Sequence, residues 1–94
     1  MTLLDDAQID EHLGLLDGWR RSDGSDIERE REFPDFAAAI EFVDRVAELA
    51  ETANHHPDIL LHGWNKVRLT LSTHSEGGLT EADFGLAGQI DQLA

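Results

Sequence analysis

The chain contains no cysteine among its 94 residues. This absence excludes disulfides, iron–sulfur clusters, thiolate zinc sites and cysteine nucleophiles, so any catalysis has to use histidines and carboxylates. The N-terminus has no basic segment followed by an apolar run, and no apolar stretch approaches the ~20 residues of a membrane span. We therefore expect a cytoplasmic protein without a membrane-spanning segment.

Basic residues are scarce as well, since 7 Lys and Arg stand against 20 Asp and Glu and the net charge is -13. A chain with this balance repels phosphate groups, so direct binding to nucleic acids or to an anionic membrane surface is disfavoured. Lys66 is the single lysine. The excess of acidic residues and the scarcity of lysine have two possible explanations, and both stay open. One is adaptation to a cytosol of high salt, and the other is a GC-rich genome with an acidic surface selected for solubility.

The remaining composition is that of a globular protein, with 40% apolar and 29% charged residues. At this length we expect residues 1–94 to form a single domain with one small core. Apolar residues at helical spacing predict a first helix over residues 4–16, stopped by Gly18. Residues 19–22 and 27–33 predict a hairpin around an Asp-Gly turn. Its second strand alternates Glu and Arg, which favours an exposed or edge strand, although residue propensity alone would also allow a helix.

The second half of the chain carries the stronger patterns. A wide apolar face predicts a long helix that begins at the N-cap Asp35 and ends near Asn54, because Pro57 forbids its continuation. Two strands are predicted over residues 58–63 and 66–73. A capping box formed by Thr80 and Asp83 opens a last helix. The order αββαββα predicts an α+β fold, a four-stranded antiparallel sheet with three helices on one face.

Three of the five histidines lie where the long helix ends and where the last strand ends: His55, His56 and His74. Histidine can both donate and accept protons at neutral pH, because its unperturbed pKa is about 6.5. The alternative is that the adjacent pair only terminates a helix. Adjacent side chains diverge, so a zinc site built from His55 and His74 with Glu51 or Asp83 is disfavoured.

The segment Glu-Thr-Ala-Asn-His-His-Pro over residues 51–57, followed by Trp64, His74 and Asp83, resembles the pterin-4a-carbinolamine dehydratases. The resemblance extends over nearly the whole chain and is weakest before Gly18. It implies dehydration of 4a-hydroxytetrahydrobiopterin to quinonoid dihydropterin and water, without a cofactor or metal. It also implies a homodimer or homotetramer.

The resemblance further assigns roles to individual residues. His55 and His74 would exchange protons as acid and base, while His56 would orient the pterin and share the work. Glu51 lies one helical turn before His55 and either orients an imidazole or is a solvated helix charge. Asp83 is expected to act mainly as the capping-box carboxylate. The residues expected to contact the pterin are Asn54, His55, His56, Ser72, Thr73, His74 and Ser75.

Two positions depart from the family pattern, since Asn54 and Ser75 stand where many members carry an acidic residue. It is therefore open whether a nearby negative charge raises the basicity of the neighbouring histidines. Two other functions are also open. Some animal members of the family act as dimerisation cofactors of a transcription factor, which implies a non-catalytic binding role. A different pterin, related to molybdopterin, would keep the ligand class and change the reaction.

Overall fold

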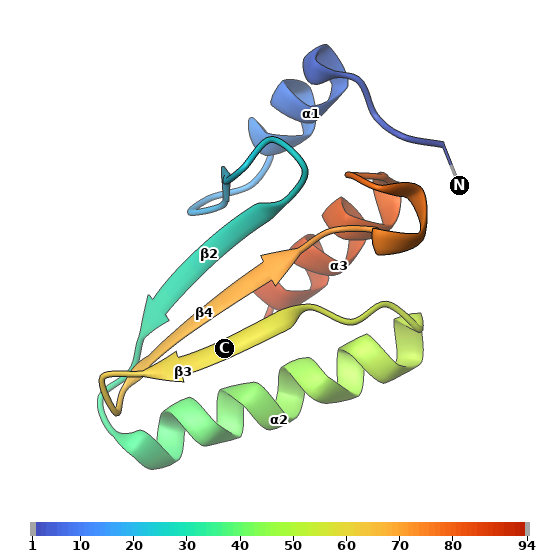
Figure 1. The fold of residues 1–94 in the computed structure, drawn as a ribbon. Helices are drawn as coiled ribbons and strands as arrows, with labels where there is room; N and C mark the ends of the chain where they lie inside the picture. The colour runs from blue at the N-terminus through green and yellow to red at the C-terminus, as the bar shows by residue number, and fades with distance from the viewer. Residues whose placement is uncertain (1, 94) are drawn as a thin grey trace.

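A computed structural model of the chain describes residues 2–93. The helices are α1 (Asp6–Leu13), α2 (Phe36–Ala53) and α3 (Glu81–Asp91), with one turn of 3-10 helix, η1 (His74–Glu76). The strands are β1 (Arg20–Arg21), β2 (Ile27–Glu32), β3 (Asp58–His62) and β4 (Lys66–Leu71). Their order along the chain confirms the predicted αββαββα arrangement and the α+β fold class (Figure 1).

The four strands form one antiparallel sheet in the order β1-β2-β4-β3. β2 pairs with β4 from Ile27 opposite Leu71 to Glu32 opposite Lys66, whereas β1 pairs only with the first two residues of β2. The charged strand β2 is therefore internal at one end and has an open edge along the rest. Only this second half of β2 has the edge position that its sequence predicts.

One face of the sheet is buried by the helices. Alternate residues of β4 project to that face because side chains in a strand alternate between its two sides. All three helices contribute buried side chains to the same cluster, so the core lies between this face and the helices. The cluster includes Ile9 of α1, Ala39, Phe42 and Val46 of α2, Leu86, Ala87 and Ile90 of α3, and Ile27, Val67, Leu69 and Leu71 of the sheet.

Some helices and strands begin or end at other residues than predicted, and local hydrogen bonds set several of these ends. α1 begins at Asp6 because Asp5 and Gln8 form a capping box, and it ends at Leu13 rather than at residue 16. Asp35 caps α2 as predicted, by accepting a hydrogen bond from the backbone of Ala38. β4 ends two residues early, and η1 follows it. Within residues 2–93, no helix has both the length and the apolar composition needed to cross a membrane.

Candidate functional site

Two chain segments far apart in sequence meet beside the C-terminal end of α2. The helix ends at Asn54, which takes the left-handed conformation with φ of 50° and donates its backbone N–H to carbonyls of the last turn. Asparagine tolerates this conformation better than most residues. The chain then turns through His55 and His56 into β3, while β4 leads into η1 and the start of α3 (Figure 1).

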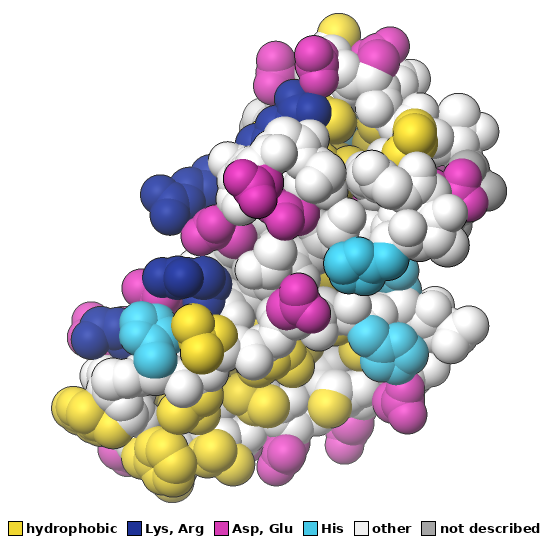
Figure 2. Space-filling model, viewed as in Figure 1, with side chains coloured by type: hydrophobic (Ala, Val, Ile, Leu, Met, Phe, Trp, Pro, Cys, Tyr) yellow, Lys and Arg dark blue, Asp and Glu magenta, His cyan; other side chains and the backbone are white. Residues whose placement is uncertain are grey.

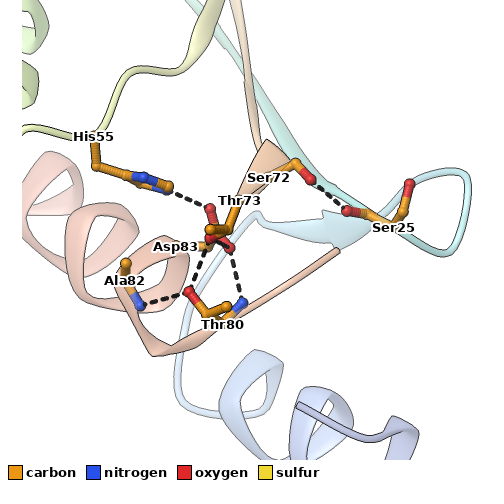
Figure 3. A network of polar contacts seen from close by, with 7 residues as sticks. All are labelled: Ser25, His55, Ser72, Thr73, Thr80, Ala82 and Asp83. Carbon is orange, nitrogen blue, oxygen red and sulfur yellow. Dashed lines mark hydrogen bonds and ion pairs between the residues drawn. The ribbon is translucent and has the colours of Figure 1, made fainter. Parts of the chain in front are cut away.

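A hydrogen bond between His55 and the buried Asp83 joins these segments. The Nε2 atom of His55 lies 2.6 Å from Oδ1 of Asp83, and the dashed line between them in Figure 3 marks this contact. The Asp83 side chain is fully buried, whereas 15% of the His55 side chain is exposed. The structure therefore holds one edge of the His55 ring against a carboxylate and leaves part of the ring open to solvent.

Asp83 receives further hydrogen bonds on its second oxygen. Oδ2 accepts from the Thr73 hydroxyl at 2.8 Å and from the backbone N–H of Thr80 at 2.9 Å. The Thr73 and Thr80 hydroxyls lie 2.8 Å apart. These donors compensate the cost of burying the carboxylate, because a buried charge needs hydrogen-bond partners. Asp83 is both the predicted cap of α3 and the partner of His55.

The direction of these hydrogen bonds fixes the tautomer of the neutral His55 ring. An ionised carboxylate only accepts hydrogen bonds, so His55 donates through Nε2. The same reasoning makes the Thr73 hydroxyl a donor to Asp83, so it accepts from Thr80. The Nδ1 atom of His55 is then the position at which the neutral ring accepts a proton.

His56 has a separate carboxylate partner. Its Nε2 atom lies 2.5 Å from Oε2 of Glu51, and both side chains are exposed. Glu51 therefore supports the second histidine of the pair and not His55. The turn at Asn54 directs the two adjacent imidazoles to different carboxylates, one exposed and one buried.

The remaining predicted residues lie on the segment that carries Thr73. His74 and Ser75 are exposed on η1, directly after Thr73, so they follow a residue that binds Asp83. Figure 2 shows histidine side chains gathered on the surface where α2 ends and β4 leads into η1. Ser72 instead donates its hydroxyl to the carbonyl of Ser25 at 2.8 Å, away from Asp83 in Figure 3.

The sequence reasoning missed the role of the Thr80 side chain. The capping box indicated that Thr80 opens α3, but not that its hydroxyl would lie against Thr73. The other two histidines lie elsewhere: His12 packs against Phe84, and His62 pairs with Glu30 at 2.6 Å. In the part of the chain that the structure describes, no three His, Asp or Glu side chains are grouped to hold a metal ion.

Comparisons with known sequences cover the whole described chain. A family model described as Pterin 4 alpha carbinolamine dehydratase matches residues 2–93. A protein of Roseiflexus castenholzii is 55% identical over 91 residues, which cover 97% of this chain and 96% of the relative. A protein of Nocardia farcinica is 55% identical over 92 residues, which cover 98% and 95%. The names of both assign them provisionally to pterin-4-alpha-carbinolamine dehydratase.

Two solved structures have similar folds. A transcriptional coactivator/pterin dehydratase from Brucella melitensis is similar with a TM-score of 0.90 and 38% identity, covering 96% of each chain. A pterin dehydratase-like protein, identified as a RuBisCO assembly factor in the alpha-carboxysome, gives a TM-score of 0.69 and 29% identity. That match covers 82% of this chain and 89% of the other.

Proposed function

Since the chain belongs to the pterin-4a-carbinolamine dehydratase family, as its motif predicted, we propose that it dehydrates 4a-hydroxytetrahydrobiopterin to the quinonoid dihydropterin and water. In this role it would serve the recycling of tetrahydrobiopterin. The observation that carries the proposal is the His55–Asp83 pair, with its buried, fully hydrogen-bonded carboxylate and its partly exposed imidazole. An imidazole held in this way is suited to proton transfer.

The reaction needs one base and one acid. His55 accepts the proton from a ring nitrogen of the pterin, and a carbon–nitrogen double bond forms as the bond from C4a to the hydroxyl oxygen breaks. His74 donates a proton to the departing hydroxyl, which leaves as water. Asp83 favours His55 as the base, because its negative charge stabilises the imidazolium that forms. Exchange of protons with solvent then restores both histidines.

The other residues of the proposed site position the substrate. His56, oriented by Glu51, is assigned to contact with the flat pterin ring. Asn54 and Ser75 supply polar groups at its rim. The hydroxyls of Ser72 and Thr73 already have protein partners, so we assign these two residues to holding the rim in place.

The test is an absorbance assay of the loss of 4a-hydroxytetrahydrobiopterin with purified protein. We expect His55→Ala and His74→Ala each to reduce kcat by about 10²–10⁴-fold, the usual contribution of a general acid or base. His56→Ala should raise KM more than it lowers kcat. His62→Ala is the matched control, because His62 also pairs with a carboxylate but lies on β3. A wild-type rate equal to that of buffer alone would refute the proposal.

We also propose that the protein forms a homodimer or homotetramer. Large apolar side chains are exposed near the start of α2 and around β3, and Figure 2 shows apolar side chains gathered in this region. They are Phe36, Ile40, Ile59, Leu60 and Trp64. Contiguous apolar surface of this kind is typical of interfaces. Light scattering at the monomer mass across a range of salt concentrations would contradict this.

A second candidate function is protein binding without catalysis. The names of the two similar structures, a coactivator and an assembly factor, support it, as does the exposed apolar surface. A wild-type protein without dehydratase activity would favour this function. Activity toward a molybdopterin-related pterin in place of 4a-hydroxytetrahydrobiopterin would instead favour a different pterin substrate. Both outcomes are read from the same purified protein.

A further inference from the structure

Two arginines of β2 project toward the helices. Arg29 and Arg31 stand opposite Leu69 and Val67 of β4, whose side chains are buried. Opposed residues of paired strands share a face, so both arginine stems lie over the helix-covered face of the sheet. Long arginine stems can cover apolar surface, but each guanidinium then needs an acceptor or contact with water.

The two guanidinium groups differ in their partners. Arg29 reaches Oδ1 of Asp91 at 2.5 Å, and the same oxygen accepts from the Trp19 indole at 2.8 Å. Between residues 2 and 93, the Arg31 guanidinium has no hydrogen bond and no ion pair. Its contacts are with two aromatic rings, 5.4 Å from the centre of Phe33 and 4.8 Å from that of Phe42.

An unpaired arginine is unexpected here, because 20 carboxylates are available to 7 basic residues. Glu41 lies near Arg31 but is bound to Arg45 at 2.7 Å. Burial, together with the positive charge of Arg29, lowers the pKa of Arg31, and Asp91 partly offsets this. Arginine nevertheless stays protonated at neutral pH, so the described part of the chain holds a half-buried cation that forms no direct ion pair.

Arg31 opens onto a cavity between the end of β2 and the first half of α2. The cavity has a volume of about 370 Å³, and Arg31 and Arg45 line it with the apolar residues Phe33, Pro34, Ala38 and Phe42. This volume falls in the range of small-molecule sites. Half of the lining residues are apolar and half are charged, since Glu32 and Glu41 line the cavity beside the two arginines. The cavity lies at the opposite end of α2 from His55.

We propose that this cavity binds a small monocarboxylate, whose carboxylate pairs with Arg31 and whose apolar body lies along the wall formed by Phe33, Pro34 and Ala38. The planar guanidinium presents its N–H groups as a fork that matches a carboxylate in a two-point contact. The acidic Glu32 and Glu41 at the same cavity and the net charge of -13 repel a phosphate dianion more than a carboxylate. The proposal does not depend on the dehydratase function.

The test uses benzoate, its neutral analogue benzamide, and inorganic phosphate at constant ionic strength in potassium chloride. Binding is followed by thermal melts and by amide chemical shifts in NMR spectra of the full chain. We expect benzoate to raise the Tm, since a ligand that binds only the folded state stabilises it, and to shift signals from residues 31–45. Benzamide and phosphate should each bind at least about tenfold more weakly than benzoate.

Variants of the two cavity arginines show whether Arg31 is the residue that binds the carboxylate of benzoate. Arg31→Met should weaken benzoate about tenfold or more, because it removes a charge-assisted pair. Arg31→Lys keeps the charge without the fork and should fall between Arg31→Met and the wild type. Arg45→Met is the matched control, since Arg45 lines the same cavity but is already paired with Glu41, and its effect should be small.

The proposal fails if benzoate does not bind, if benzamide or phosphate binds equally well, or if Arg31→Met binds benzoate like the wild type. If Arg31→Met does not fold, wild-type affinity in Arg31→Lys would equally refute the two-point contact. Dehydratase activity measured on the same variants separates the two proposals. It should be unchanged whatever the outcome of the benzoate titration.

Discussion

At the C-terminal end of α2, a buried carboxylate has a donor on each oxygen, whereas beside the first half of α2 a half-buried guanidinium has no acceptor among residues 2–93. Asp83 is held by Thr73 and Thr80, from the segment that leads from β4 into α3, and by His55, from the distant segment after α2. Within residues 2–93, the Arg31 guanidinium has no hydrogen bond and no ion pair, and it lies over the rings of Phe33 and Phe42. Both groups lie on the helix-covered side of the molecule, so burial alone does not account for the difference.

The difference indicates two ways of handling a ligand. A saturated network fixes the orientation of His55 before any substrate arrives, so little reorganisation is needed at the moment of proton transfer. A guanidinium that contacts aromatic rings but forms no ion pair among the described residues can still gain a charge-assisted hydrogen bond when an anion arrives from outside the protein. The first arrangement suits proton transfer and the second suits binding.

Asp83→Ala should have the largest effect. The substitution leaves the His55 ring, the Thr73 hydroxyl and the Thr80 N–H without their shared acceptor. We expect the free energy of unfolding to fall by about 3 kcal/mol or more, with loss of dehydratase activity. Urea denaturation measures the first and the absorbance assay the second.

Glu51→Ala is the control for that substitution. It removes an exposed carboxylate that also pairs with a histidine. Its effect on the free energy of unfolding should stay within about 0.5 kcal/mol, as for most exposed ion pairs. Equal losses in both variants would mean that the buried network has no special role in stability.

Arg29→Met and Arg31→Met form the next comparison. Loss of the Arg29 guanidinium deprives Asp91 of its cation, so we expect the free energy of unfolding to fall by about 1–2 kcal/mol. Loss of the Arg31 guanidinium breaks no ion pair and should change it by less than about 0.5 kcal/mol. Urea denaturation of both variants provides the measurement, and a similar loss in both would show that Arg31 has a partner in solution.

Salt should stabilise the whole molecule and leave the buried network unaffected. At low ionic strength the excess carboxylates repel one another, and potassium chloride screens this repulsion. We expect the Tm to rise between millimolar and molar salt, by a few degrees for each ~1 kcal/mol recovered. Potassium sulfate controls for general salting-out. A Tm that does not change with potassium chloride would contradict adaptation to high salt.

The Thr73→Val variant tests whether salt affects the buried hydrogen bonds around Asp83. Its difference in Tm from the wild type should stay constant as salt is added, because a buried hydrogen bond is screened much less than a surface charge. A difference that shrinks with salt would place the Thr73–Asp83 contact within reach of solvent ions.

Glu30→Gln should have the smallest effect on the Tm of these variants, and only above the pH at which Glu30 titrates. The hydrogen bond from His62 and the charges of His62 and Arg68 lower the pKa of Glu30 below its ordinary 4.5, against a smaller opposing effect of burial. A lowered folded-state pKa gives stability that is complete above the unfolded-state pKa and is lost as the pH falls through the folded one. The wild type and the variant should therefore differ slightly in Tm at neutral pH and converge below pH 4.5. A constant difference would exclude this linkage.

Much of the fold followed from local patterns. The caps at Asp35 and Thr80, the helix end near Asn54 and the element order are all properties of short segments, and each is confirmed. The turn η1 was not predicted, because its three residues carry no periodic pattern. The face of the sheet to which the arginines of β2 project was not predicted either, because the sequence analysis considered only the alternation of Glu and Arg.

The sequence by itself determined the helix caps and the order of the elements, because these patterns are set by spacing along the chain. That the histidine motif carries the chemistry stays a prediction. Tertiary structure decided which groups these side chains contact. The pairing of β2 with β4 places the arginines on the helix-covered face of the sheet. The turn at Asn54 brings His55 against Asp83 and His56 against Glu51. The physical reason is the sequence distance over which each interaction acts. Propensity and capping act within a few residues, whereas Asp83 lies 28 residues from His55 and Asp91 lies 62 from Arg29, so only packing brings them within hydrogen-bond distance.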